Sequence, residues 1–251
     1  APGYSGSQGK AVVLKRTNNT WNEVDELKPD DPAVWSFFGH SVAIDGDVAV
    51  VGAYFTDDGA NNAGSAYVFT RFNESWEQTA KLVSGSPRAD DEFGTSVAID
   101  GNLIFVGMPN HDTVQGENAG AVYVFMRFGN GWLRRYKLTA KNGSPNDRFG
   151  TRVALSGDTA VVGTGKKEDS SSQLGTAHIV TRQPNGEWLE TDILVAPDGR
   201  VGVDFGQEVA VNEHAIVVGA PNYPTEPQNG PGAVHVFLPT GNDGQWSYVE
   251  S

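Results

Sequence analysis

Residues 38–53 read FGHSVAIDGDVAVVGA, and this stretch recurs three times further along the chain. The four copies begin 55, 56 and 56 residues apart. Self-similarity at a fixed period of this kind is typical of repeat architectures, in which each copy is one supersecondary unit. Each copy opens with a Phe-Gly pair: Phe38–Gly39, Phe93–Gly94, Phe149–Gly150 and Phe205–Gly206.

Two further markers keep the same period. The segment GSAYVFTR from Gly64 returns as GAVYVFMR, GTAHIVTR and GAVHVFLP, and an earlier fifth copy reads GKAVVLKR from Gly9. Tryptophans then follow at spacings of 55, 56, 56 and 58 residues, at Trp21, Trp76, Trp132, Trp188 and Trp246. Three markers in step over five cycles establish an internal repeat.

Each repeat predicts four short strands. Asp45-Gly46 is typical of a two-residue hairpin turn, and the apolar run after it indicates a strand buried on both faces. The fourth strand alternates in polarity, so we expect it to be half exposed. No segment has sustained 3.6-residue periodicity, which predicts very little helix. In the first full repeat the expected strands are 40–44, 48–53, 66–71 and 76–82.

Four antiparallel strands at a period of about 55–56 residues favour an all-β fold, a β-propeller of four-stranded blades. The chain then holds four full blades and one half blade, as one propeller domain or a segment of one. We expect the half blade at 1–34 and the blades at 38–92, 93–148, 149–204 and 205–251.

The repeats resemble a known family. In each repeat a Phe-Gly pair is followed, after about 13 residues, by a Gly-Ala-Pro position. This tripeptide is intact at residues 219–221 and degenerate at 52–54, 107–109 and 163–165. The pattern is similar to the FG-GAP repeat. The resemblance covers essentially the whole chain. It implies the seven-bladed propeller of integrin α subunits and related extracellular proteins, which include some fungal lectins. It is specific for fold rather than for function, because propellers host many activities.

The opening APGYSGSQG aligns with the repeat as well. If Ala1-Pro2 corresponds to Ala220-Pro221, the chain starts inside a repeat. An open end would leave about ten apolar side chains uncovered, each worth roughly 1.5–3 kcal/mol. We therefore expect that this sequence is a window of a longer repeat protein, or that another chain supplies the cover.

Composition restricts the partners. The net charge is −13, with an isoelectric point near 4.7, so the chain should repel nucleic acid and anionic membranes. Such a surface suits cations, basic partners or neutral glycans. The chain has no cysteine, which excludes disulfides, thiolate metal sites and cysteine nucleophiles. No apolar run approaches the length of a membrane span, so we expect no membrane insertion in this segment.

Calcium is a candidate cofactor. The family resemblance implies a calcium loop between the first and second strands, but the turns there, such as Asp45-Gly46, are too short to surround an ion. Oxygen-rich loops occur instead between the second and third strands, and they are candidate Ca²⁺ sites. The alternative is a solvated acidic loop. The candidate ligands are Asp57, Asp58, Asn61, Asp112 and Glu117.

No enzyme motif is present. The five histidines have no paired metal spacing, and the chain has no nucleophile elbow, P-loop or Rossmann glycine pattern. We expect a protein without catalytic activity. His178 and His235 share a repeat position with Tyr67 and Tyr123, which indicates a structural role. The periodic tryptophans are interpreted in the same way, rather than as sugar-stacking platforms.

Three N-x-S/T sequons are candidate glycosylation sites in a secreted eukaryotic protein: Asn18, Asn73 and Asn142. The first two occupy the same turn in successive repeats, on one face of the expected propeller. Asn142 lies with the loops of the opposite face, which would then be favoured for partner binding.

These observations favour a non-enzymatic extracellular or cell-surface β-propeller that serves as an adhesion, matrix or assembly module. Its partners would be other proteins, or further copies or segments of itself. The alternative is a glycan-binding lectin that uses the loops between blades.

Overall fold

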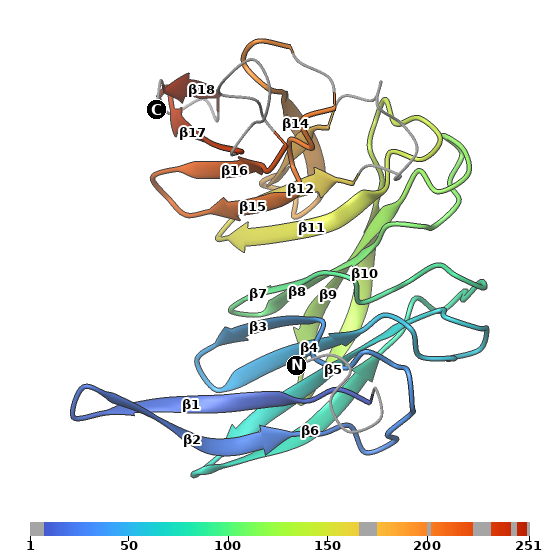
Figure 1. Ribbon diagram of the computed structural model, residues 1–251, viewed down its shortest axis with the longest axis vertical. Helices are drawn as coiled ribbons and strands as arrows, with labels where there is room; N and C mark the ends of the chain where they lie inside the picture. Colours follow the sequence, from blue (N-terminus) through green and yellow to red (C-terminus); the bar gives the residue numbers. More distant parts are fainter. Residues whose placement is uncertain (1–7, 166–174, 200–201, 223–231, 242–244, 250–251) are drawn as a thin grey trace. The chain divides into compact units, whose positions relative to one another are not determined.

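Every regular element in the described residues is a β-strand (Figure 1). The computed structural model describes residues 8–165, 175–199, 202–222, 232–241 and 245–249. The opening residues 1–7, whose alignment with the repeat is predicted above, lie outside these ranges. The prediction of an all-β chain is confirmed for the described part.

The strands form one two-stranded sheet and four four-stranded sheets. The small sheet consists of β1 (Ala11–Thr17) and β2 (Thr20–Leu27). Each larger sheet takes four consecutive strands in sequence order, with antiparallel neighbours. The first contains β3 (Ser41–Asp45), β4 (Val48–Ala53), β5 (Ser65–Phe72) and β6 (Ser75–Leu82). The second contains β7 (Val97–Asp100), β8 (Leu103–Met108), β9 (Ala121–Phe128) and β10 (Gly131–Leu138).

The remaining two sheets repeat this order. One contains β11 (Phe149–Ser156), β12 (Thr159–Thr164), β13 (Ala177–Arg182) and β14 (Trp188–Leu194). The other contains β15 (Glu208–Val211), β16 (Ile216–Ala220), β17 (Ala233–Pro239) and β18 (Trp246–Val249).

The chain divides into two compact units. The first unit is Ala1–Val106 with Phe125–Arg135, and the second is Gly107–Val124 with Tyr136–Ser251. The division passes through strands β8, β9 and β10 of one sheet. We describe each unit by itself.

The second strand of the repeat is the most deeply buried. All six residues of β4 and all six of β8 are buried, which confirms the prediction from their continuous apolar sequence. The fourth strand, by contrast, alternates between exposed and half-buried residues in β6. Its outer face therefore contacts solvent while the inner strands build the core.

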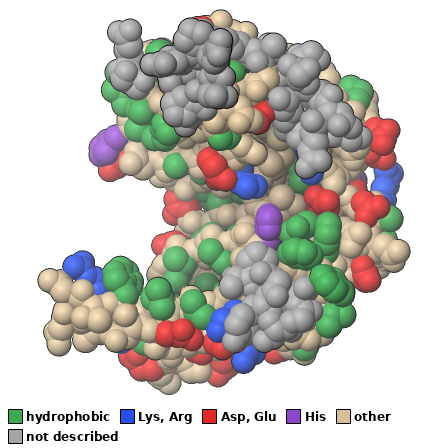
Figure 2. Space-filling view, in the orientation of Figure 1, with side chains coloured by type: hydrophobic (Ala, Val, Ile, Leu, Met, Phe, Trp, Pro, Cys, Tyr) green, Lys and Arg blue, Asp and Glu red, His purple; other side chains and the backbone are tan. Residues whose placement is uncertain are grey.

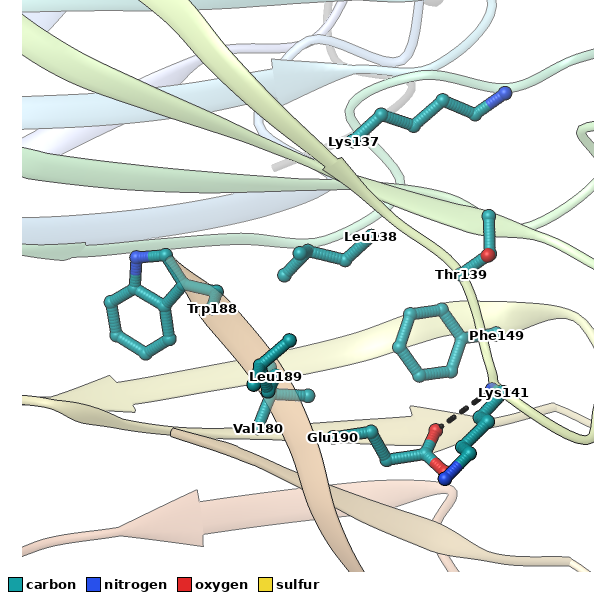
Figure 3. Close-up of a pocket in the computed structure, with 9 residues that line it drawn as sticks. All are labelled: Lys137, Leu138, Thr139, Lys141, Phe149, Val180, Trp188, Leu189 and Glu190. Carbon is teal, nitrogen blue, oxygen red and sulfur yellow. Dashed lines mark hydrogen bonds between the residues drawn. The ribbon is translucent and has the colours of Figure 1, made fainter. Parts of the chain in front are cut away.

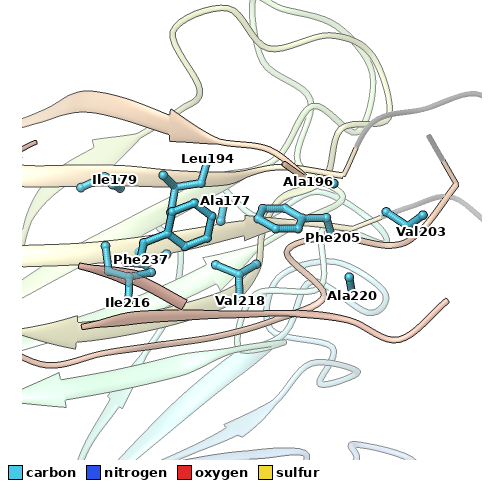
Figure 4. Packing of buried hydrophobic residues seen from close by; sticks show 11 residues of the cluster. Ala177, Ile179, Leu194, Ala196, Val203, Phe205, Ile216, Val218, Ala220 and Phe237 are labelled. Atoms are coloured by element: carbon cyan, nitrogen blue, oxygen red, sulfur yellow. The ribbon is translucent and has the colours of Figure 1, made fainter. Parts of the chain in front are cut away.

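Large aromatic residues fill the core of each unit. In the second unit, Phe205 and Phe237 lie among aliphatic side chains from β12, β13, β14 and β16 (Figure 4). Their rings meet edge to face with centroids 6.2 Å apart. In the first unit, Phe38 makes the same kind of contact with Phe69, at 6.1 Å. The cluster around Phe38 also includes Ala11 and Leu27 of the two-stranded sheet.

The Phe-Gly pair joins consecutive sheets, which explains its periodic recurrence. Phe93 is fully buried and its backbone bridges to Gly64, at the start of the preceding third strand. A Cβ atom added to Gly64 would lie 2.0 Å from the Phe93 carbonyl oxygen. Gly94 has a φ of +92°, and a Cβ atom there would lie 2.2 Å from the Ser65 carbonyl oxygen. Only glycine fits both positions.

Candidate functional site

Backbone and side-chain hydrogen bonds join the loop after the second strand to the loop before the next Phe-Gly pair in the first two four-stranded sheets. In the first unit, the Asn62 side chain donates to Asp90 Oδ1 at 2.7 Å, and the Asn62 carbonyl accepts from Glu92 N at 3.1 Å. The N–H of Phe93 then donates to the Ala63 carbonyl at 2.9 Å. These contacts form a loop clasp, by which we mean the paired segments 61–63 and 90–93.

Of the predicted calcium ligands, Asn61 lies in this loop clasp and Asp57 is hydrogen-bonded to it. Asp57 Oδ1 accepts a hydrogen bond from the N–H of Asn62 at 2.9 Å. The backbone carbonyl of Asn61 accepts from Asp90 N at 2.9 Å. Both residues are exposed. Their oxygens therefore stabilise the conformation of the loop, whatever ion they would bind.

Asp58, the third predicted ligand in this loop, belongs to a charged network. Its carboxylate accepts from Lys81 Nζ at 2.7 Å and from the Ser65 hydroxyl, and the same ammonium pairs with Asp31. The Lys81 ammonium also lies 5.3 Å from the centroid of the Tyr67 ring. Burial alone would raise the pKa of Asp58, but the hydrogen bonds from Lys81 and Ser65 outweigh it and lower the pKa. This carboxylate is therefore held ionised by a protein cation.

The corresponding loop of the second unit repeats part of the arrangement. Asp112 Oδ1 accepts from Asn118 N at 3.0 Å, as Asp57 does from Asn62. The carbonyl of Glu117 accepts from Asn146 N at 2.8 Å. Across all described residues, no three acidic or histidine side chains come close enough together to hold a metal ion. Calcium binding by these loops stays a prediction.

The three sequon asparagines are all exposed. Asn18 and Asn73 occupy the β1–β2 and β5–β6 turns in the left-handed conformation, with φ values of 50° and 58°. Lys15 Nζ, on β1 shortly before the first of these turns, pairs with Glu74 Oε2 in the second turn at 3.0 Å. Asn142 lies in the loop between β10 and β11. Glycosylation at these positions is a prediction that surface exposure permits.

A cavity of about 380 Å³ opens in the second unit between the end of β10 and strand β14. Its apolar side chains are Leu138, Phe149, Val180, Trp188 and Leu189 (Figure 3). Thr139, Lys141 and Glu190 contribute polar atoms in the same view, whereas the Lys137 side chain extends away from the other labelled residues. We call this cavity the β10–β14 pocket. It combines aromatic rings with both signs of charge.

Glu190 links the walls of the β10–β14 pocket. Its carboxylate accepts from Lys141 N at 3.1 Å and lies 2.9 Å from His178 Nδ1. The His178 side chain is buried, and the Glu190 side chain is 10% exposed. Burial would raise the pKa of Glu190, but the hydrogen bond and charge of His178, with the Lys141 N–H, lower it. His178 Nε2 lies 2.9 Å from the Thr176 hydroxyl. The carboxylate is therefore fixed in position.

The periodic tryptophans differ in burial although they share one repeat position. Trp188 is 5% exposed in the wall of the β10–β14 pocket, while Trp21 is 64% exposed on β2. Trp76 is half-buried and packs against the Phe38 cluster. Trp132 and Trp246 are also half-buried. Burial of each indole thus depends on which sheets lie beside it.

Sequence reasoning did not single out Lys141 or Glu190. Both are ordinary charged residues in a loop and an outer strand, and nothing in their spacing suggests a joint role. The repeat alignment gives one sequence signal for the role of Glu190, because Gln78 occupies the same position in an earlier repeat. The Gln78 side chain likewise accepts a hydrogen bond from a loop N–H, that of Asp30, at 3.0 Å. The outer strand of a repeat thus contacts the loop that precedes its own sheet.

The family model for the FG-GAP repeat matches four segments, residues 21–69, 76–125, 132–180 and 188–237. The chain belongs to the FG-GAP repeat family. A search among curated proteins finds no match to it. Each matched segment begins at an outer-strand tryptophan and ends in the third strand of the next sheet, so it contains the Phe-Gly pair that joins the two sheets.

FG-GAP repeats are blades of β-propellers. The four four-stranded sheets are therefore blades, and β1–β2 is a partial one, as the sequence predicts. Repeats of this family are typical of extracellular or surface proteins, serve as protein-interaction modules and are typically non-catalytic. In the ranges that the structure describes, no helix could span a membrane.

Proposed function

We propose that this FG-GAP protein is an extracellular or cell-surface module for adhesion, matrix contact or assembly, which binds other proteins through exposed apolar side chains. The observation that supports the proposal is an aromatic cluster at the entry to the first full blade. Phe37, Tyr54 and Phe55 contact one another, with ring centroids 4.3–5.4 Å apart. His40 packs against Tyr54 at 4.4 Å, and the neighbouring Trp35 is 64% exposed.

The backbone under this cluster makes its aromatic side chains unusual. Trp35 and Phe37 have φ values of 63° and 54°, in the left-handed region that bulky side chains seldom adopt. At the same positions the next repeat has Asp90 and Glu92, with φ values of 62° and 58°. The fold imposes this conformation in both repeats, yet only the first repeat places aromatic residues there. A strained backbone conformation that carries an exposed aromatic side chain, here Trp35, is typical of binding surfaces, and Phe37 beside it is half-buried.

Cell and matrix attachment tests the proposal. Immobilised protein is expected to retain cells or extracellular-matrix preparations, and Trp35→Ala should reduce retention severalfold. Trp21→Ala is the matched control, because Trp21 is equally exposed at 64% but lies outside the cluster. Absence of retention by the unmodified protein, or equal loss in both variants, would contradict the proposal.

A glycan-binding lectin is the second candidate function. The β10–β14 pocket favours it, because its lining combines the buried rings of Trp188 and Phe149 with the polar side chains of Glu190 and Lys141 around a cavity of about 380 Å³. A glycan array discriminates the two functions. Reproducible hits that Glu190→Gln weakens support the lectin. A blank array with measurable self-association supports the assembly module.

A further inference from the structure

Glu190 places a carboxylate in the wall of the β10–β14 pocket. Its Oε2 atom accepts from Lys141 N at 3.1 Å and lies 2.9 Å from His178 Nδ1. No group of the described residues donates to its Oε1 atom. The side chain is 10% exposed, and its neighbours lower its pKa, so the carboxylate is charged at neutral pH. A charged oxygen that is largely shielded from solvent favours a ligand that donates to it.

Lys141 brings the opposite charge to the same end of the pocket. Its backbone N–H holds Glu190, and the charge of its ammonium helps to lower the pKa of that carboxylate. Lys141 is exposed, and its ammonium makes no hydrogen bond or ion pair with a described group. Figure 3 shows its side chain beside the Glu190 carboxylate. The pocket therefore presents a cation and an anion next to each other.

The repeat does not require this pair of charges. At the positions of Lys141 and Glu190, the other repeats have the combinations Asp30 with Gln78, Gly85 with Arg134 and Pro197 with Tyr248. None of these joins side chains of opposite charge. A Cβ atom added to Gly85 would collide with the guanidinium of Arg134, so the arginine side chain itself fills that space in the earlier repeat. The charged pair is therefore a feature of this one pocket.

Apolar side chains form the rest of the β10–β14 pocket. In Figure 3, Leu138 and Leu189 lie between Trp188 and the charged pair. Phe149 and Val180 complete the apolar wall. Small-molecule pockets of about 300–1,000 Å³ are lined mostly by apolar side chains, with a few polar groups that fix the orientation of the ligand. The volume of about 380 Å³ lies in this range, so the pocket suits a small ligand with an apolar part beside its charged groups.

The charge of the protein restricts the ligand further. The net charge of the chain is −13, and Figure 2 shows Asp and Glu side chains spread over the face that it draws. Such a surface repels a ligand with a net negative charge. The Lys141 ammonium opposes a ligand that carries a positive charge alone. A molecule that carries both charges satisfies both polar groups of the pocket and has no net charge.

We propose that the β10–β14 pocket binds a zwitterionic small molecule with an apolar side chain, of the chemical class of free aliphatic α-amino acids. The ammonium of the ligand donates to Glu190 Oε1, and its carboxylate pairs with the Lys141 ammonium. The apolar side chain packs between Leu138 and Leu189. The inference goes beyond the proposed adhesion function, because the aromatic cluster that supports that function shares no residue with this pocket.

Calorimetry with leucine and its analogues tests the inference on the unmodified protein. We expect saturable binding of leucine. N-acetyl-leucine lacks the ammonium, leucinamide lacks the carboxylate and glycine lacks the apolar side chain, so each should bind roughly tenfold or more weakly. Equal binding of all four compounds, or no binding of leucine at millimolar concentration, would overturn the inference.

Protein variants locate the binding. Lys141→Met removes an exposed ammonium but keeps the backbone N–H that Glu190 accepts, so the protein should stay folded and bind leucine roughly tenfold or more weakly. Glu190→Gln should weaken binding to a similar extent. Glu213→Gln is the matched control, because that side chain is 81% exposed and lies outside the pocket. Leucine binding that Lys141→Met and Glu190→Gln both leave unchanged would overturn the inference.

Two further results separate this inference from the proposed functions. Binding of neutral sugars without binding of leucine would overturn the inference and support the lectin. The attachment assay with Trp35→Ala involves no residue of the β10–β14 pocket, so the adhesion function and the amino-acid site can fail separately.

Discussion

The hydroxyl of Ser41 donates a hydrogen bond to the backbone carbonyl of Gly94, 2.9 Å away on the next repeat. This contact places β3 against the segment that leads into β7. In the second unit the same approach recurs between Gly163 and Gly206, where a Cβ atom on Gly163 would lie 2.0 Å from the Gly206 carbonyl oxygen. The glycines of the FG-GAP pattern are therefore sites of close backbone contact.

Substitution of Gly94 by Ala should destabilise the protein strongly. The new Cβ atom would lie 2.2 Å from the Ser65 carbonyl oxygen and would hold a φ of +92°. We expect a loss of about 3 kcal/mol or more in the free energy of unfolding, measured by chemical denaturation. Gly101→Ala is the control: its φ is +55° with no atom within 4 Å of the added Cβ, so it should lose only about 1–2 kcal/mol. Equal losses would argue against steric contact as the reason for the Phe-Gly motif.

The tryptophans offer a test with residue type and repeat position held constant. Trp188→Ala should cost roughly 3–5 kcal/mol because it empties a buried site. Trp21→Ala should cost less than about 1 kcal/mol, because that side chain is already 64% exposed. Thermal or denaturant unfolding of the two variants gives the comparison. A large loss for Trp21→Ala would contradict the described position of its indole.

Glu190 should make stability depend on pH in the acid range. Its pKa in the folded protein lies below the ordinary value of 4.5, so it contributes stability above that value and loses the contribution as pH falls through the lowered pKa. Glu190→Gln should cost roughly 1.5–3 kcal/mol at neutral pH. The difference from the unmodified protein should shrink below about pH 4.5, as unfolding midpoints across pH would show. A pH-independent difference would mean that packing, not charge, explains the effect.

Calcium binding by the loop residues can be decided by titration. The Asp57 carboxylate accepts one hydrogen bond, from the N–H of Asn62. A carboxylate has about four acceptor sites, so Asp57 could also contact an ion. The expected outcome is a rise in melting temperature at millimolar Ca²⁺ that Asp57→Asn reduces. Asp47→Asn is the control, because Asp47 lies in the β3–β4 turn, away from this loop, and accepts a hydrogen bond from Arg71. No response of the unmodified protein would remove calcium from the description.

The repeat made the fold predictable. Phe93 and its counterparts mark where each sheet begins, and the apolar run of β4 indicates burial on both faces. The candidate sites were less accessible to sequence reasoning. Asp58 reads as a loop carboxylate, but its partner Lys81 lies 23 residues away on β6. Glu190 and Lys141 are 49 residues apart and meet because an outer strand contacts the loop before its own sheet.

The sequence by itself determined the architecture: strands, hairpin turns and blade order follow from periodic apolar, glycine and aromatic positions, which act locally. Tertiary structure decided which equivalent residues become sites. Val42 and Val97 occupy the same place in the repeat, yet Val42 is exposed and Val97 is buried, because β3 and β4 pack against β7 whereas, among the described residues, no such strand pair packs against β3. The burial of a side chain and its hydrogen-bond partners depend on the neighbouring sheets. The repeat pattern places similar residues in every copy, but it does not determine which element packs beside each copy.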